Sequence, residues 1–458
     1  MSPAAFFATF ACYISLASAQ SPELHQATTT DLVISDRNAT QSVTIKENNN
    51  IECCYEAVAS DRLLPQGPEA NFYPSRRASS SLYIDSWVDA GIFGNADSPG
   101  NRFNGPLTFA DRANEFNMSQ LYLAIGRDAK IDPCSWNLGG RVDLLYGTDY
   151  LWVSANGLET YSNGNPRWNS SDGPRWTPNG ASHAAMYGLA MPQLYGEIAS
   201  PMLGGLKAKA GHFYSPLGLE SAMAVDNFFN TRSYSYMYGL PKTLTGFVLE
   251  KPILDDRVKL SAGFTQGWDN WENTSGQLDF LGGATLESAD KKTSLSFNLI
   301  TGGADATHPE GDRTTYALVF KTQLTKKFSY AFEHVLGTED NARQVRANSF
   351  IDAQWYGINQ HFIYCINSRW ALGYRVEWFQ DFRNSRVYPL PVGQSKGCNF
   401  IDMSLGLDYT PRSWFSLRSE LRWDHSNISA PAYGVDGLYD EFTKKNQFLF
   451  SIDMLVQF

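Results

Sequence analysis

Segments in which apolar and polar side chains alternate recur from residue 82 to residue 458, and this pattern constrains the fold most strongly. The clearest segment covers 136–146, where Leu138, Val142 and Leu144 fall on one face and Arg141 and Asp143 on the other. Because successive side chains of a β-strand point to opposite faces, such a segment predicts a strand with one apolar and one polar face. The same alternation is present at 258–265, 294–299, 369–378, 401–409 and 415–424.

The number and spacing of these segments predict a membrane-spanning barrel. The predicted strands start near residues 82, 115, 136, 192, 206, 242, 257, 277, 293, 314, 328, 350, 369, 399, 413 and 446, which gives about sixteen strands, an even number as in bacterial barrels. The connections alternate in length. Short ones lie near 200–205, 252–256, 287–292, 325–327, 366–368 and 411–412, and long ones at 94–114, 148–191, 214–241, 302–312, 338–349, 383–397 and 426–444. Short periplasmic turns that alternate with long outer loops are typical of outer-membrane barrels.

Composition favours the same architecture. Charged residues make up 18% of the chain and aromatic residues 14%, whereas soluble proteins carry about 25% charged residues. The long stretch 176–196 contains no acidic residue, lysine or arginine, but Pro178 and Pro192 make it a poor lipid-facing helix. A membrane protein without spanning helices must be a closed barrel. We therefore predict an all-β fold, a transmembrane antiparallel up-and-down β-barrel over residues 82–458, located in the outer membrane.

The two ends of the chain carry their own signals. Residues 3–19 are apolar and end in Ala17-Ser18-Ala19, which predicts a signal peptide at 1–19 that is cleaved, although a basic segment before it is missing. The alternative is a membrane anchor, but the apolar run is short for a span. Residues 20–81 are polar without a sustained period, so we expect a mostly disordered periplasmic arm, with a small plug as the alternative. The final strand, 446–458, alternates up to Phe458 and resembles the terminal strand that outer-membrane assembly machinery reads.

Charge and cysteine content narrow the range of partners. The net charge of −10 argues against a nucleic-acid partner. After removal of residues 1–19 the cysteines do not show zinc-ligand spacing with histidine, so we expect no metal role and no cofactor, although Asp and Asn residues in the outer loops leave structural Ca²⁺ open. We expect scattered thiols or at most one or two disulfides among Cys53, Cys54, Cys134, Cys365 and Cys398.

The connection at 214–241, which follows the fifth predicted strand, carries a family resemblance. The runs GHFYSPLG at 211–218, DNFFNTRSY at 226–234 and GLPKT at 239–243, followed by Gly246, resemble the OmpL-like β-barrel porin family found in planctomycetes and relatives. The resemblance covers about residues 81–458. It implies passive transport across the outer membrane, and it carries over no catalytic residues.

The same connection is the candidate constriction of a pore. A barrel of sixteen strands is wide enough to hold water, and a long loop after strand five can fold inward and narrow it. We expect Glu220, Asp226 and Arg232 to be the charges of this loop. Acidic groups opposite basic groups would create a transverse field that selects solutes by charge and dipole, whereas the alternative is that they are solvated lumen residues. The wall charges that we expect to face the loop are Arg141, Asp143, Lys259, Arg375, Glu377, Arg418, Glu420 and Arg422.

The function predicted from these features is that of an outer-membrane porin, a water-filled channel for passive diffusion of small hydrophilic solutes. Its partners would be outer-membrane lipid and these solutes, and a homotrimer is suggested by fold analogy alone. One alternative is a barrel enzyme such as a lipid hydrolase, but adjacency of Ser182 and His183 does not make a catalytic pair, so we predict no enzyme. The other alternative is a secreted all-β carbohydrate-binding protein, because aromatic side chains suit sugar stacking.

Overall fold

The computed structural model describes residues 82–458 except 133, 162, 172–174, 178–179, 183, 274, 304–310, 347–348, 388–396 and 432–433. All described residues belong to one unit, Asn50–Phe458. The predicted signal peptide at 1–19 and the predicted arm at 20–81 lie outside the described residues.

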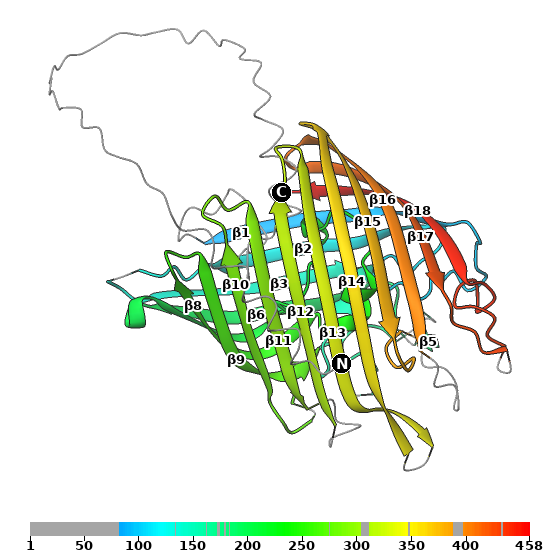
Figure 1. Cartoon of the computed structure of the whole chain (residues 1–458), viewed down its shortest axis with the longest axis horizontal. Helices are drawn as coiled ribbons and strands as arrows, with labels where there is room; N and C mark the ends of the chain where they lie inside the picture. Colours follow the sequence, from blue (N-terminus) through cyan, green and yellow to red (C-terminus); the bar gives the residue numbers. More distant parts are fainter. Residues whose placement is uncertain are drawn as a thin grey trace, which may run out of the picture. The chain divides into compact units, whose positions relative to one another are not determined.

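Sixteen strands of the described chain form one closed antiparallel barrel (Figure 1). Each strand pairs with the barrel strand before it and the one after it, and the last strand returns to the first. The predicted barrel is confirmed, and every predicted strand start lies within four residues of the observed one. The strands are β1 (Tyr83–Asn95), β2 (Glu115–Arg127), β3 (Asn137–Gly147), β6 (Gly188–Ser200), β7 (Leu206–Tyr214), β8 (Thr243–Ile253), β9 (Val258–Trp268), β10 (Asp279–Glu287), β11 (Thr293–Gly303), β12 (Asp312–Gln323), β13 (Phe328–Arg346), β14 (Ser349–Asn367), β15 (Trp370–Asp381), β16 (Cys398–Arg412), β17 (Phe415–Ser426) and β18 (Asn446–Gln457).

The connections hold the remaining elements. Between β3 and β6 lie the 3₁₀-helix η3 (Thr148–Val153) and a small sheet of β4 (Arg175–Thr177) and β5 (Gly180–Ser182). The turn between β6 and β7 contains η4 (Met202–Gly204), and the connection between β7 and β8 contains η5 (Ala224–Asp226) and α2 (Tyr234–Gly239). The turn predicted at 411–412 lies at 413–414 instead, because β16 continues through Arg412. None of the helices in the described residues is long and apolar enough to cross a membrane.

Closure of the barrel depends on its two end strands. β1 and β18 pair in register from Trp87 opposite Gln457 to Asn95 opposite Leu449. Just beyond this ladder the backbone groups of Ser86 and Phe458 exchange two hydrogen bonds, at 3.1 and 2.9 Å. Because this pairing removes both sheet edges, the barrel has no open edge between its first and last strands.

Alternation along each strand separates an apolar outer face from a polar inner face. On β15, Tyr374 and Trp378 are exposed by 38% and 40%, whereas Arg375 and Glu377 are almost fully buried. On β18, Ile452 is exposed by 38% and its neighbours on the other face are buried. Apolar side chains that point outward suit the hydrocarbon of a bilayer, so the buried polar side chains face the inside of the barrel.

Candidate functional site: the inward connection and the remaining cavity

The connection between β7 and β8, residues 215–242, is here named the inner loop. It follows the fifth strand of the barrel and, unlike an outer loop surrounded by water, most of it is buried. Ser233 starts α2 because its side chain accepts a hydrogen bond from the Tyr236 backbone N–H, which satisfies one of the free donors of the first turn. All residues of α2 are buried. The inner loop is therefore packed against other parts of the protein along its length.

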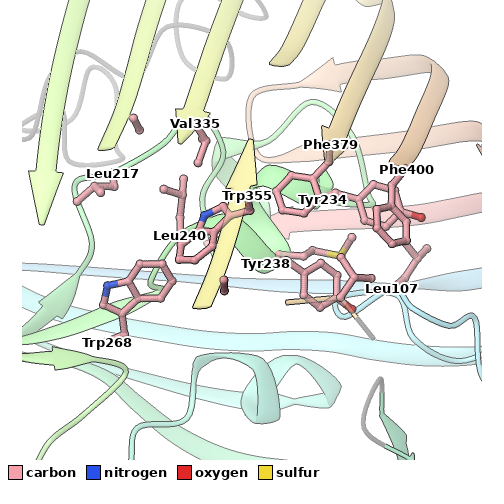
Figure 2. Close-up of a cluster of buried hydrophobic side chains, with 14 of the residues drawn as sticks. Leu107, Leu217, Tyr234, Tyr238, Leu240, Trp268, Val335, Trp355, Phe379 and Phe400 are labelled. Atoms are coloured by element: carbon pink, nitrogen blue, oxygen red, sulfur yellow. The ribbon is translucent and has the colours of Figure 1, made fainter. Parts of the chain in front are cut away.

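Apolar side chains of the inner loop pack against side chains that point inward from the wall (Figure 2). The Tyr234 ring lies 5.2 Å from the ring of Phe400 and 6.5 Å from that of Phe379, measured between centroids. Trp355 Nε1 on β14 donates a hydrogen bond to the Gly239 carbonyl at 3.1 Å. These contacts bring the loop against β14, β15 and β16 from the inside of the barrel.

Two glycines of the wall make room for the inner loop. Gly373 on β15 and Gly406 on β16 face each other in register. A Cβ atom at Gly373 would lie 2.2 Å from the Phe228 ring, and one at Gly406 would lie 2.9 Å from the same ring. Both distances are shorter than carbon atoms tolerate, so larger residues would displace Phe228. Phe228 of the inner loop therefore packs against the wall at this glycine pair.

Arg375 is the main polar link between the wall and the inner loop. Its Nη1 donates to Glu220 Oε1 at 3.0 Å and to the Thr231 carbonyl at 2.9 Å, and its Nε donates to Asp402 Oδ2 at 2.6 Å. Burial alone would raise the pKa of Glu220, but the nearby Arg375 guanidinium outweighs this effect and holds that pKa below its usual value. Glu220 is thus a charged carboxylate that is paired with Arg375 of the wall.

Two wall carboxylates bind backbone N–H groups of the inner loop. Glu420 accepts hydrogen bonds from the N–H groups of Asn230 and Thr231, at 2.9 and 3.0 Å. Glu377 accepts from the N–H groups at the start of α2, including that of Ser235 at 2.6 Å. Carboxylates at a helix N-terminus satisfy donors that have no partner within the helix. Both glutamates therefore hold the loop in place.

Two wall arginines bind backbone carbonyl groups of the inner loop. Arg418 donates to the carbonyl of Ala224 at 2.8 Å, and Arg422 donates to that of Arg232 at 2.7 Å. Each arginine also pairs with a carboxylate of the wall, Asp453 for Arg418 and Asp424 for Arg422. The wall charges predicted on β15 and β17 are therefore covered by the inner loop.

The other predicted site residues have different surroundings. Arg141 and Asp143 pair with each other at 2.6 Å and are buried. Arg232 Nε donates to the Ser221 carbonyl at 2.8 Å, within the inner loop itself. Asp226 is buried beside a small space behind the loop. Arg141 Nη2 also donates to Met223 Sδ of the inner loop at 3.8 Å. The predicted residues that the structure gathers at the loop are thus Arg141, Glu220, Arg375, Glu377, Arg418, Glu420 and Arg422, whereas Lys259 lies on β9 and lines a second cavity.

A cavity of about 120 Å³ lies between residues 213–222 and the wall formed by β7 to β12. Its wall side carries hydroxyl and amide groups, for example those of Ser261, Ser296 and Asn298. Alternation along 294–299 predicts a polar face with Ser296 and Asn298, but uncharged side chains alone do not indicate a pore. The lysines of this cavity, Lys209, Lys242 and Lys321, were not among the predicted site residues.

A second cavity, of about 660 Å³, adjoins the first. It lies among the turns that follow β8 and β10, and Lys207 and Lys259 are among its lining residues. Glu250 and Ser261 line both cavities, so the two spaces meet at the inner face of β8 and β9. These turns lie at the end of the barrel that also holds the first residue of β1 and the last of β18. Free space inside the barrel therefore remains between residues 213–222 and the strands β7 to β12.

A family model described as beta-barrel porin-2, OmpL-like, matches residues 81–458. The chain belongs to this porin family. The match covers the whole barrel, so the porin is an outer-membrane channel protein, and the family predicted from the inner-loop motifs is confirmed. The sequence of this porin has no match among curated proteins.

Solved structures similar to this porin share its fold at low sequence identity. OmpT, an outer membrane protein of Vibrio cholerae folded in vitro, has a TM-score of 0.51 at 8% identity, over 84% of this chain and 100% of that chain. The outer membrane channel DcaP of Acinetobacter baumannii has a TM-score of 0.50 at 11% identity, over 83% and 98%. OprB of Pseudomonas putida has a TM-score of 0.50 at 10% identity, over 83% and 94%. At such identities the likeness supports the barrel fold alone.

Proposed function

We propose that this porin forms a water-filled channel for passive diffusion of small hydrophilic solutes, and that solutes pass between residues 213–222 and the wall of β7 to β12. The observation that carries this proposal is the pair of adjoining cavities on that side of the barrel. A barrel of this strand number encloses more space than side chains of the wall alone can fill. The space that the inner loop leaves free is the natural path for water and solutes.

In this proposal the inner loop is the constriction of the channel. Of its predicted charges, Glu220 lines the free cavity, Arg232 donates a hydrogen bond within the loop, and Asp226 is buried beside the small space behind it. The wall charges that bind the loop act as positioning groups, because rigid placement of the loop fixes the width of the path. Those positioning groups are Arg375, Glu377, Arg418, Glu420 and Arg422.

We also propose a cleaved signal peptide at 1–19, a periplasmic arm at 20–81 and a homotrimer. The outer face of β6 and β7 supports a subunit interface because it carries the small residues Gly196, Ala208 and Ala210, whereas β15 carries Tyr374 and Trp378 outward. Bulky aromatic side chains suit contact with lipid, and small ones suit close approach of a second barrel.

We propose no enzymatic activity. A hydrolase would need a serine whose hydroxyl is hydrogen-bonded to a histidine. His183 lies outside the described residues, His212 Nδ1 is hydrogen-bonded to Thr245, and His361 lies 3.7 Å from Glu220. The exposed apolar outer face of the barrel also disfavours a secreted carbohydrate-binding protein, because that face would be in water.

Swelling of proteoliposomes in solutions of neutral polyols tests the proposed channel. Because the inner loop narrows the path, glycerol should enter and swell the liposomes quickly, and a trisaccharide should enter at least about ten times more slowly. Liposomes that contain heat-denatured protein are the control. Absence of glycerol-driven swelling in liposomes with correctly folded barrel would contradict the proposed function.

A further inference from the structure

Ammonium groups line the free path from one cavity to the next. Lys209 on β7, Lys321 on β12 and Lys242 at the end of the inner loop line the first cavity. Lys207 and Lys259 line the second cavity, together with charges of both signs from the neighbouring turns. The wall arginines Arg375, Arg418 and Arg422, in contrast, are covered by the inner loop. The cations that line the first cavity are therefore lysines.

The first cavity has fewer carboxylates than lysines, and one of these carboxylates is already paired with an arginine. In the first cavity the carboxylates are Glu220 and Glu250. Glu220 is engaged by Arg375 at 3.0 Å and by the Ser233 hydroxyl at 2.7 Å. Lys207 and Lys209 share one carboxylate, that of Glu197, at 3.1 and 3.6 Å. Glu197 is thus also engaged by lysines of the path.

The positions of these lysines are fixed by neighbouring groups. The Lys242 ammonium donates to the carbonyls of Met237 and Leu240 at 2.7 and 3.0 Å. The Lys209 ammonium lies 4.8 Å from the centre of the Tyr195 ring. A fixed charge in a narrow space with low-dielectric walls acts on a solute more strongly than one on an open surface. Lysines held in this way can thus set the charge preference of the path.

The strands β9, β10 and β11 offer neutral hydrogen-bond donors to the first cavity. Ser261, Ser294 and Ser296 place hydroxyl groups there. The Thr285 side chain also lines the cavity, and its hydroxyl is buried with no hydrogen-bond partner among the described residues. Hydroxyl groups can donate hydrogen bonds to the oxygens of an anion that has left part of its water shell. Ammonium groups and free hydroxyls together suit an oxyanion.

We infer that the channel favours small anions that carry a carboxylate or phosphate group over cations of similar size. This inference rests on the proposed function, because a charge preference requires an open path. It assigns the selectivity to two lysines that line the first cavity, Lys242 at the end of the inner loop and Lys321 on β12, and it gives Glu250 the opposing role of attracting cations.

The test is the reversal potential of the full-length porin in planar bilayers across a tenfold gradient of potassium chloride. We expect anions to be favoured about threefold, with the same sign when acetate or phosphate replaces chloride. The double variant Lys242→Gln and Lys321→Gln should bring the ratio close to one, and Glu250→Gln should raise it. Lys326→Gln is the matched control for the single variant Lys242→Gln, because it removes one positive charge from an exposed turn that lines neither cavity.

The possible outcomes separate the inference from the proposed function. Absence of conductance steps from folded wild-type porin would remove the channel itself. Steps with no charge preference, or with a preference for cations, would overturn the inference and leave the channel in place. A change in Lys326→Gln equal to that in Lys242→Gln would also overturn it, because the net charge alone would then be responsible. If heat-dependent gel migration shows that the double variant does not fold, the reversal potential of Lys242→Gln alone is the test.

Discussion

Excision of residues 219–238, with a short Gly-Ser linker in their place, should raise the single-channel conductance roughly threefold or more, because a barrel of this size is otherwise wide enough for an open aqueous channel. The barrel should still form. Its strands are joined by their own hydrogen-bond ladders, and Arg375, Arg418 and Arg422 keep their wall partners when the loop is absent. Planar-bilayer recordings of the purified variant would give the conductance.

A linker of the same composition inserted at Gly434 is the control for this excision. Gly434 is exposed in the connection between β17 and β18, away from the inner loop in sequence. This insertion should leave the conductance of the porin unchanged. A loop-excised barrel that folds and conducts no better than the wild type would show that residues 219–238 do not narrow the channel.

Replacement of Arg375 by alanine should release the inner loop from the wall. Arg375 lies within 3.0 Å of Glu220, 2.6 Å of Asp402 and 3.5 Å of Glu420, so its loss leaves three carboxylates without their shared cation. Removal of one partner from a buried ion pair costs about 3–5 kcal/mol. Because the barrel ladder does not depend on this residue, the cost should fall on docking of the loop. We expect noisy current at a higher mean level, and protease cleavage within 219–238.

Two further variants make the Arg375 prediction specific. Arg375→Lys keeps the charge but loses the planar fork of donors, so its current noise should be intermediate. Arg412→Ala removes an exposed arginine at the end of β16 and should behave as the wild type. Quiet current and protease resistance in a correctly folded Arg375→Ala porin would contradict the positioning role.

The alternation of apolar and polar residues was sufficient to predict the barrel. Alternation along 369–378 places Arg375 and Glu377 on the inner face, as the structure has them. The start of the loop after strand five also followed from the strand count. The alternation of apolar and polar residues does not predict the path of that loop. Side-chain alternation tells which residues face inward, but the part of the lumen that stays open depends on contacts between distant segments.

Two groups of residues illustrate this limit. Lys209 and Lys321 lie on the free path, but they occur in segments with less regular alternation. They were therefore not among the predicted wall charges. Gly373 and Gly406, in contrast, carried a usable signal. Once β15 and β16 are aligned, two inward glycines fall opposite each other, and such a pair indicates close approach by another segment. That segment is the inner loop.

The central claim is that solutes pass along β11 and not along β16. The most direct measurement is modification of single cysteines by a charged, membrane-impermeant thiol reagent during channel recording, in a porin whose native cysteines are replaced by serine. Ser296 on β11 lines the free cavity, and Ser404 on β16 is buried beneath the inner loop, where its hydroxyl accepts from Arg375 at 3.0 Å. We predict that Ser296→Cys reacts and loses about half of its current or more, whereas Ser404→Cys does not react until residues 219–238 are excised. Reaction of Ser404→Cys in the intact porin, with Ser296→Cys unaffected, would contradict the account.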